Sequence, residues 1–212
     1  DKSNFTQLVF LLRKKLGKKQ VVSFAAGGFT KFFQESVEWG KVMPKLDFVN
    51  LMTYDIFHGY STTTGHHTAL YSTSGQLESV DRTVRYLDSI GVPRSKMIIG
   101  AAFYGRVWED VPSLNNGLYQ PGKFKRGVAN RHLEKYFQET EGFVEYWDEV
   151  AHAPYRYNAK EKMFFTHDNR ESVRLKTRYA LQIGLGGIMF WQLREDLEAG
   201  GLLEAIHEAI KE

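Results

Sequence analysis

The sequence predicts an α/β protein in which parallel strands alternate with helices, with a small α+β module inserted between two of these units. Short apolar runs of strand length alternate with segments of helical periodicity along most of the chain. This alternation breaks between residues 106 and 170 and then resumes. We therefore expect one domain made of residues 1–105 and 171–212, with the α+β module over residues 106–170.

Three helices and three buried strands are expected before the inserted module. Apolar side chains recur at helical spacing in the helical segments, whereas the strand segments are short apolar runs that end at glycine or at polar loops. In chain order the elements are a helix over 4–16, a strand over 20–26, a helix over 31–43, a strand over 48–54, a helix over 80–90 and a strand over 97–104.

The inserted module and the end of the chain complete the pattern. Within the module, residues 145–148 and 162–165 are short alternating pieces. After it come a helix over 172–184, a strand over 187–192 and a helix over 202–210. Four β/α units are half of the eight that close a barrel, and they would leave two unpaired edges. We therefore expect part of the fold to lie outside this chain.

Composition limits the classes of function that the chain can have. The net charge is only +3 and Lys and Arg are scattered apart from a short run over 13–19, so nucleic acid is not an expected partner. The absence of cysteine excludes disulfides, and no run approaches the roughly 18 apolar residues that cross a membrane. The chain opens at Asp1 without Met, which indicates a processed or truncated end.

Polar and aromatic side chains gather where the expected strands end. The second strand ends in Tyr54 and Asp55, the third leads into Tyr104 and Arg106, and the fourth ends near Trp191. In β/α barrels the working residues lie at these carboxyl ends. The set offers aromatic surface, hydroxyl donors, a carboxylate and a cation. It suits a neutral, polyhydroxylated ligand that carries amide groups.

Four short motifs stand in order along the chain: residues 25–28 (AAGG), 51–55 (LMTYD), 103–106 (FYGR) and 186–191 (GGIMFW). They resemble the ends of the fifth to eighth strands of glycoside hydrolase family 18, the chitinases. Residues 154–158 (PYRYN) fall where many members carry an insertion domain. The resemblance covers essentially all of the chain. It implies the C-terminal part, strands five to eight, of a TIM (β/α)8 barrel with a small α+β insertion domain.

The resemblance also implies roles for individual residues. In this family the N-acetyl carbonyl of the bound sugar attacks its own anomeric carbon, an exception to the usual two-carboxylate scheme. Tyr54 would hold that carbonyl and Asp55 would bind a sugar hydroxyl, so these two are the implied catalytic residues. The implied substrate-binding residues are Met52 in the acetamide pocket, Tyr104 and Arg106 on neighbouring hydroxyls, Trp108 extending an aromatic cleft, and Trp191 as the floor. No cofactor is expected.

One part of the family pattern is absent. The family's general acid is a Glu that ends an Asp-x-x-Asp-x-Asp-x-Glu run on the fourth strand, and this chain has no such run. The resemblance implies a secreted (extracellular or periplasmic) hydrolase of chitin or N-acetylglucosamine oligosaccharides. Because the acid is missing, we expect this chain to be an inactive C-terminal part of that hydrolase, which needs the N-terminal half of the barrel. The alternatives are a chitinase-like lectin without the acid and a peptidoglycan- or spore-associated family member.

Several conspicuous residues have simpler interpretations. His66 and His67 suggest a metal site, but no further ligand is placed nearby by motif, so we expect a solvated loop and no metal. Asp196 is expected to begin a loop or to cap the last helix. Met52 and Trp191 could belong to the core and Arg106 could pair with a surface carboxylate, although the motifs favour ligand contacts.

Overall fold

Four parallel strands form the sheet on which the rest of the molecule is built. The computed structural model describes residues 1–212, and its strands have the order β1-β2-β3-β9 with every neighbouring pair parallel. The strands are β1 (Ser23–Gly27), β2 (Phe48–Met52), β3 (Met97–Ala102) and β9 (Gly187–Trp191). The four strands that the apolar runs predicted are thereby confirmed. Since β1 and β9 each pair on one side only, the sheet is open at both edges.

Helices pack along this sheet and bury its apolar side chains. They are α1 (Lys2–Leu16), α2 (Thr30–Glu35), α3 (Trp39–Val42), α4 (Val80–Ser89), α6 (Arg170–Gln182) and α7 (Leu202–Lys211), with short 3-10 turns at 43–45, 94–96, 114–117, 130–132 and 193–195. The largest buried apolar cluster, of 20 residues, joins the strands to α1, α2, α3, α4 and α6. None of the helices combines the length and the apolar character that a membrane crossing requires.

The prediction of a single helix over 31–43 is wrong, because the chain forms two helices there, α2 and α3. The indole N–H of Trp39 donates to the carbonyl oxygen of Phe33 at 2.9 Å, and the two rings lie 5.9 Å apart. Both side chains are buried. Burial of two large aromatic rings outweighs the loss of a helical turn, a tertiary effect that helical periodicity does not reveal.

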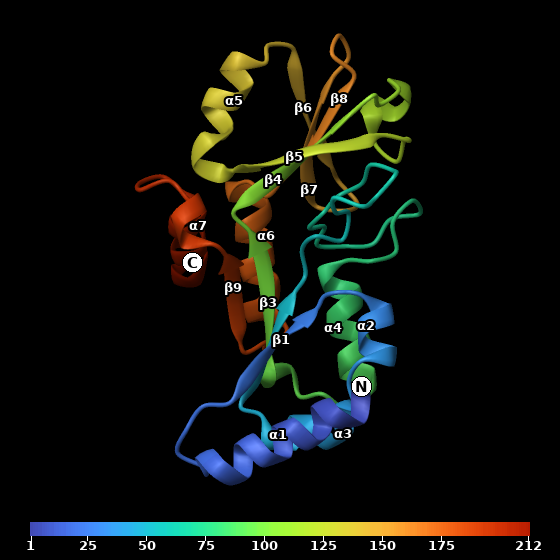
Figure 1. Ribbon diagram of the computed structural model, residues 1–212. Coiled ribbons are helices and arrows are strands. Elements are labelled where there is room, and N and C mark those ends of the chain that lie inside the picture. The colour runs from blue at the N-terminus through green and yellow to red at the C-terminus, as the bar shows by residue number, and fades with distance from the viewer.

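A second sheet of five antiparallel strands stands at the carboxyl end of the first (Figure 1). Its order is β5-β4-β8-β7-β6, with β4 (Tyr104–Glu109), β5 (Lys123–Ala129), β6 (Phe143–Asp148), β7 (Ala153–Asn158), β8 (Met163–Thr166) and the helix α5 (Leu133–Glu139). Only Phe103 separates β3 from β4, so Tyr104 belongs to this second sheet rather than to the third parallel strand. Because the four strands of the first sheet are parallel, the carboxyl end of each one faces the second sheet.

The expectation that Asp196 caps the last helix is confirmed. Its carboxylate accepts hydrogen bonds from the backbone amides of Leu202 and Leu203, at 2.9 and 2.8 Å. These amides lie in the first turn of α7, where no intrahelical acceptor is available. Asp196 also accepts from Nδ2 of Asn130, so the same side chain ties the second sheet to α7.

The second sheet folds over the long loop that joins β2 to α4, residues 53–79. His66 Nε2 lies 3.0 Å from Oδ2 of Asp148, and the backbone amide of His67 donates to Thr166 at 3.2 Å. Both histidine side chains are fully buried, so the expectation of a solvated loop is wrong. The residues that cover the loop come about 80 to 100 positions later in the chain, which no local pattern indicates.

The Asp148 carboxylate should make stability depend on pH. Burial by itself would raise the pKa of Asp148, but hydrogen bonds from His66 and from the Ala151 and Val150 amides outweigh it and lower the pKa from 3.8 to about 2. Since the pKa is lower in the folded state, the stabilisation is complete above about pH 4 and is lost as the pH falls toward 2.

The Asp148→Asn variant should therefore have a lower melting temperature than the wild type near neutral pH, and this difference should shrink as the pH falls below about 4. Thermal unfolding followed by circular dichroism across that range measures it. The exposed neighbour Glu149, replaced by Gln, serves as the control. A melting difference that stays constant with pH contradicts the assignment.

Large apolar side chains are exposed on α1 and at the open edge of the parallel sheet. Leu8 and Leu11 on α1 are 51% and 63% exposed, and Trp191 on β9 is 55% exposed. Unpaired strand edges and contiguous apolar surface favour association between chains. We therefore expect the isolated chain to self-associate in sedimentation velocity experiments.

Charges placed on α1 should weaken that association. A Leu8→Glu/Leu11→Glu variant should shift the sedimentation profile toward the monomer, because it removes exposed apolar area without touching the sheet. A matched change at another exposed site, Glu134→Gln, should leave the profile unchanged. A wild-type chain that is monomeric and melts cooperatively at every concentration contradicts this expectation.

Candidate functional site

A hollow of about 720 Å³ opens at the carboxyl end of the parallel sheet, between β1, β2 and the second sheet. Its walls come from the ends of β1 and β2, from the loop after β2, and from β4 and β5. The lining residues are Gly27, Gly28, Phe29, Met52, Tyr54, Asp55, His58, Gly59, Tyr60, Arg106 and Phe124. Met52, Tyr54, Asp55 and Arg106 of the predicted site are therefore brought together, as the strand-end argument expects.

Asp55 is the centre of a hydrogen-bonded group inside this hollow. The hydroxyl of Tyr104 donates to Oδ1 of Asp55 at 2.6 Å, and Nε of Arg106 donates to the same oxygen at 2.7 Å, with Nη2 of Arg106 in ion-pair contact with it at 2.6 Å. None of these contacts uses Oδ2. Because the Asp55 side chain is 38% exposed and lines the hollow, Oδ2 is left to accept a hydrogen bond from a ligand.

The surroundings of Asp55 keep it ionised. Burial would raise its pKa, but the nearby imidazole of His67 and the hydrogen bonds from Tyr104 and Arg106 outweigh burial and hold the pKa well below its usual range. Burial raises the pKa of Tyr104, and the Asp55 charge raises it further. At neutral pH the site therefore holds one carboxylate, one guanidinium and protonated phenols.

The backbone of Asp55 adopts the left-handed conformation, with φ of 58°. This conformation is uncommon for residues other than Gly, Asn and Asp, and it turns the chain sharply where β2 ends. The turn directs the carboxylate toward β4, where Tyr104 and Arg106 lie on the same face of the strand. The left-handed turn at Asp55 and the short β3–β4 connection thus bring residues of two separate motifs into one cluster.

Tyr54 lies beside this cluster with its ring largely buried. Its ring is edge-on to Tyr104 at 6.2 Å, and its hydroxyl contacts only the sulfur of Met189, a weak acceptor at 3.9 Å. Burial and the neighbouring Asp55 charge raise the pKa of Tyr54 to about 12, so the phenol keeps its proton. A Cβ on Gly100 would lie 2.7 Å from this ring, so β3 makes room for Tyr54 by carrying glycine there.

Trp108 does not extend the hollow, and that prediction is wrong. Its side chain is fully buried in the core of the second sheet, where it packs against Phe124 and Phe164. Trp108 shares its face of β4 with Arg106, because the pairing with β8 stays in register and the extra residue of the β4–β5 pairing, Lys125, lies in β5. The indole N–H instead donates to the carbonyl of Ser61 at 3.2 Å and so supports the loop after β2.

Trp191 stands apart from the hollow, at the end of the edge strand β9. It pairs in register with Ala102 of β3 and is not among the residues that line the hollow. With 55% of its surface exposed, its ring faces solvent at the open edge of the sheet. A contact between Trp191 and a ligand bound beside Tyr54 therefore stays a prediction.

Three aromatic residues line the hollow that the sequence analysis did not single out: Phe29, Tyr60 and Phe124. Tyr60 is 94% exposed and Phe29 is 43% exposed, and the Arg106 guanidinium lies 5.5 Å from the centre of the Phe124 ring. Phe29 lies two residues after the end of β1, so the strand-end rule could have found it. Phe124 lies on the second sheet, and no local signal connects it with the strand ends.

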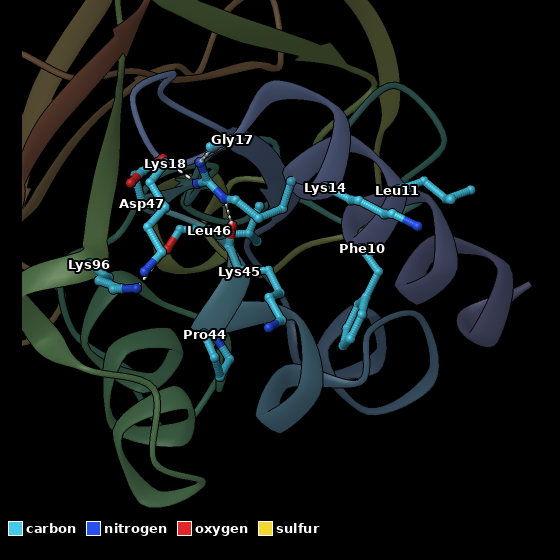
Figure 2. Close-up of a pocket in the computed structure, with 11 residues that line it drawn as sticks. Phe10, Leu11, Lys14, Gly17, Lys18, Pro44, Lys45, Leu46, Asp47 and Lys96 are labelled. Atoms are coloured by element: carbon cyan, nitrogen blue, oxygen red, sulfur yellow. Dashed lines mark hydrogen bonds and ion pairs between the residues drawn. The ribbon is translucent and has the colours of Figure 1, made fainter.

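A second large hollow, of about 670 Å³, lies at the opposite end of the parallel sheet, between α1 and the turn before β2 (Figure 2). Its most enclosed cations already have partners within the chain. Arg13 pairs with Asp47 at 2.6 Å, and Lys96 donates to the carbonyls of Met43 and Leu46. It contains none of the predicted site residues, and we therefore place the functional site at the carboxyl end.

Known proteins of similar sequence and structure show which family the chain belongs to. The profile of the family described as Glycosyl hydrolases family 18 matches residues 1–196. Chitinase A1 of Niallia circulans is 33% identical over 92% of this chain and 31% of its own length; for chitinase B of Serratia marcescens the values are 28%, 92% and 49%. The chain thus spans no more than half of either chitinase.

Solved structures agree with the sequence matches. A family 18 N-acetylglucosaminidase from Paenibacillus barengoltzii superimposes with a TM-score of 0.88 at 38% identity, over 98% of this chain and 63% of that one. A chitinase from Bacillus thuringiensis superimposes with a TM-score of 0.91 at 29% identity, over 99% of this chain and 40% of that one. Together with the match over residues 1–196, these likenesses show that the chain belongs to glycoside hydrolase family 18.

Proposed function

We propose that the chain is the C-terminal part, strands five to eight, of a (β/α)8-barrel hydrolase that cleaves β-1,4-linked N-acetylglucosamine polymers such as chitin. The observation that carries the proposal is the bonding of Asp55 to Tyr104 and Arg106 in a hollow at the carboxyl ends of parallel strands. Family membership supports a glycoside hydrolase reaction. The similarity to chitinase A1 and chitinase B supports chitin as the polymer.

The proposed reaction is assisted by the substrate. The carbonyl oxygen of the sugar's own N-acetyl group attacks the anomeric carbon as the glycosidic bond breaks, and water then opens the oxazolinium with retention of configuration. The Tyr54 hydroxyl donates to that carbonyl, while Oδ2 of Asp55 accepts from a sugar hydroxyl and its charge stabilises the developing cation. Met52 lines the acetamide pocket, and Trp191 forms the floor once the barrel is complete.

The leaving sugar needs a proton that this chain does not supply. The chain has no Asp-x-x-Asp-x-Asp-x-Glu run, so we place the general acid and the first four strands upstream in the full-length protein. The two open edges of the sheet support this arrangement, as does the limited share of the chitinases that the chain spans. Residues 1–105 and 171–212 then complete the barrel, residues 106–170 form the insertion domain, and the enzyme acts outside the cell or in the periplasm.

Hydrolysis of chitotetraose by the full-length protein tests the proposal. The first product should carry the β anomer, which proton NMR detects within minutes of mixing. Tyr54→Phe should lower kcat on the order of 100-fold, because the attacking carbonyl is no longer held. Tyr136→Phe, at a half-buried tyrosine of α5 outside the hollow, is the matched control. A wild-type protein that releases no product, or the inverted anomer, contradicts the proposed reaction.

A chitin-binding lectin is the second candidate, favoured by the absence of the acidic run from this chain. Such a protein would use the same hollow to bind the sugar but would not break the glycosidic bond. Calorimetric binding of chitotetraose without product release identifies it. The residue encoded at the upstream general-acid position gives the same answer: Glu favours the enzyme, whereas Gln or Leu favours the lectin.

A further inference from the structure

His67 lies beneath the candidate site without reaching the hollow. Its side chain is fully buried, and it is not among the residues that line the hollow. Its backbone is fixed on both sides, because its amide donates to Thr166 at 3.2 Å and its carbonyl accepts from Ile56 at 3.1 Å. The backbone that carries the imidazole is therefore held in place by bonds that do not involve the ring.

The ring of His67 faces the protein side of Asp55. Nδ1 lies 3.7 Å from Oδ1 of Asp55, and the ring centre lies 5.3 Å from that of Tyr104. Neither ring nitrogen makes a hydrogen bond within 3.5 Å. A buried donor without a full partner costs free energy, and an apolar side chain at this position would avoid that cost.

Burial favours a neutral ring for His67. It lowers the pKa of the imidazole by more than the Asp55 and Asp168 carboxylates raise it, and the cation of Arg106 lowers the pKa further. A neutral imidazole carries one N–H, and the nitrogen that faces the Asp55 carboxylate is the one that gains by carrying it. The proton therefore belongs on Nδ1.

We infer that His67 is a positioning residue for Asp55: its Nδ1–H faces Oδ1 from the buried side and keeps that oxygen turned toward Tyr104 and Arg106. Oδ2 then stays directed into the hollow, where the sugar binds. This inference rests on the proposed function for its effect on turnover. It assigns His67 no contact with the substrate and no proton transfer, because the ring is sealed from the hollow.

Two substitutions at His67 test the inference in the full-length protein. His67→Leu removes both ring nitrogens and should lower kcat on chitotetraose by up to about 100-fold with little change in KM, because Asp55 loses its orientation. His67→Asn keeps an N–H donor near the place of Nδ1 and should restore most of kcat. An unchanged kcat in His67→Leu overturns the inference, as does a His67→Asn variant that is no better than His67→Leu.

The neighbouring histidine provides the matched control. His66 is as deeply buried as His67, but its ring bonds Asp148 rather than Asp55. His66→Leu should therefore lower the melting temperature while leaving kcat close to that of the wild type. If both leucine variants lose kcat in proportion to their melting temperatures, His67 acts only through stability and the inference is overturned.

A spectroscopic measurement tests the role of His67 independently of catalytic turnover. Imidazole nitrogen-15 shifts of the wild-type protein should show His67 as a neutral ring protonated on Nδ1, whereas a proton on Nε2 overturns the inference. Hydrolysis by the wild type tests the proposed function separately. A full-length protein that binds chitotetraose without cleaving it refutes the hydrolase proposal, and the nitrogen shifts still decide the role of His67.

Discussion

Replacing Asp55 by Asn in the full-length protein is expected to lower kcat/KM for chitotetraose by about 10² to 10³-fold. The amide has the shape of the carboxylate and tolerates the left-handed backbone, with φ of 58°, so the substitution removes charge rather than structure. It leaves the Arg106 guanidinium without its carboxylate and removes the negative charge beside the reacting sugar. Initial rates over a range of substrate concentrations measure the effect.

Asp110 offers a matched control for this substitution. It also has a left-handed backbone, with φ of 57°, and also pairs with a cation, Lys123, at 2.8 Å. Unlike Asp55 it lies on the exposed surface of the second sheet, outside the hollow. Asp110→Asn should therefore keep the wild-type rate. An Asp55→Asn variant with the wild-type rate contradicts the central place given to Asp55.

The second large effect is expected on stability, at a fully buried ion pair. Lys176 Nζ lies 2.7 and 2.8 Å from the two carboxylate oxygens of Asp168 and donates to Thr68 at 2.6 Å. Asp168 in turn accepts from the Ala102 amide at 3.0 Å and from Ser172 at 2.6 Å. These bonds join the end of β3, the loop after β2, the exit of the second sheet and α6 at one point.

Lys176→Met should lower the free energy of unfolding by about 3–5 kcal/mol, because it leaves the Asp168 charge buried without its cation. Urea unfolding of the full-length protein measures the change. The double variant Lys176→Met/Asp168→Asn should recover part of the loss, since it removes both charges. The exposed Lys123→Met is the control and should change stability little. Equal effects of Lys176→Met and Lys123→Met contradict the structural role of the buried pair.

The sequence predicted those parts of the site that lie at the ends of strands. Tyr54 and Asp55 follow an apolar run that is long enough for a buried strand, so their place at a strand end is a local property. Tyr104 and Arg106 were also expected at a strand end, although β4 carries them as part of the second sheet. They still lie near the end of β3, because only Phe103 separates the two strands.

The sequence did not predict features that depend on distant contacts. Trp108 follows Arg106 by two residues and shares its face of β4, but Phe124, Phe164 and the loop after β2 cover its ring. His66 and His67 have the polarity of a solvated loop and become buried only because the second sheet covers them. Sequence spacing shows neither the side chains that cover Trp108 nor the sheet that covers the two histidines.

The sequence by itself determined the four parallel strands, the interruption by an α+β module and the chemistry at the strand ends, because hydrophobic periodicity and strand-end residues are properties of short segments. Only the tertiary structure decided which oxygen of Asp55 stays free, which aromatic rings line the hollow, and how the Lys176–Asp168 pair is sealed. Those outcomes depend on segments up to 108 residues apart that meet after the chain has folded. The energies of these interactions come from burial and hydrogen-bond geometry, and both are set only when the chain has folded.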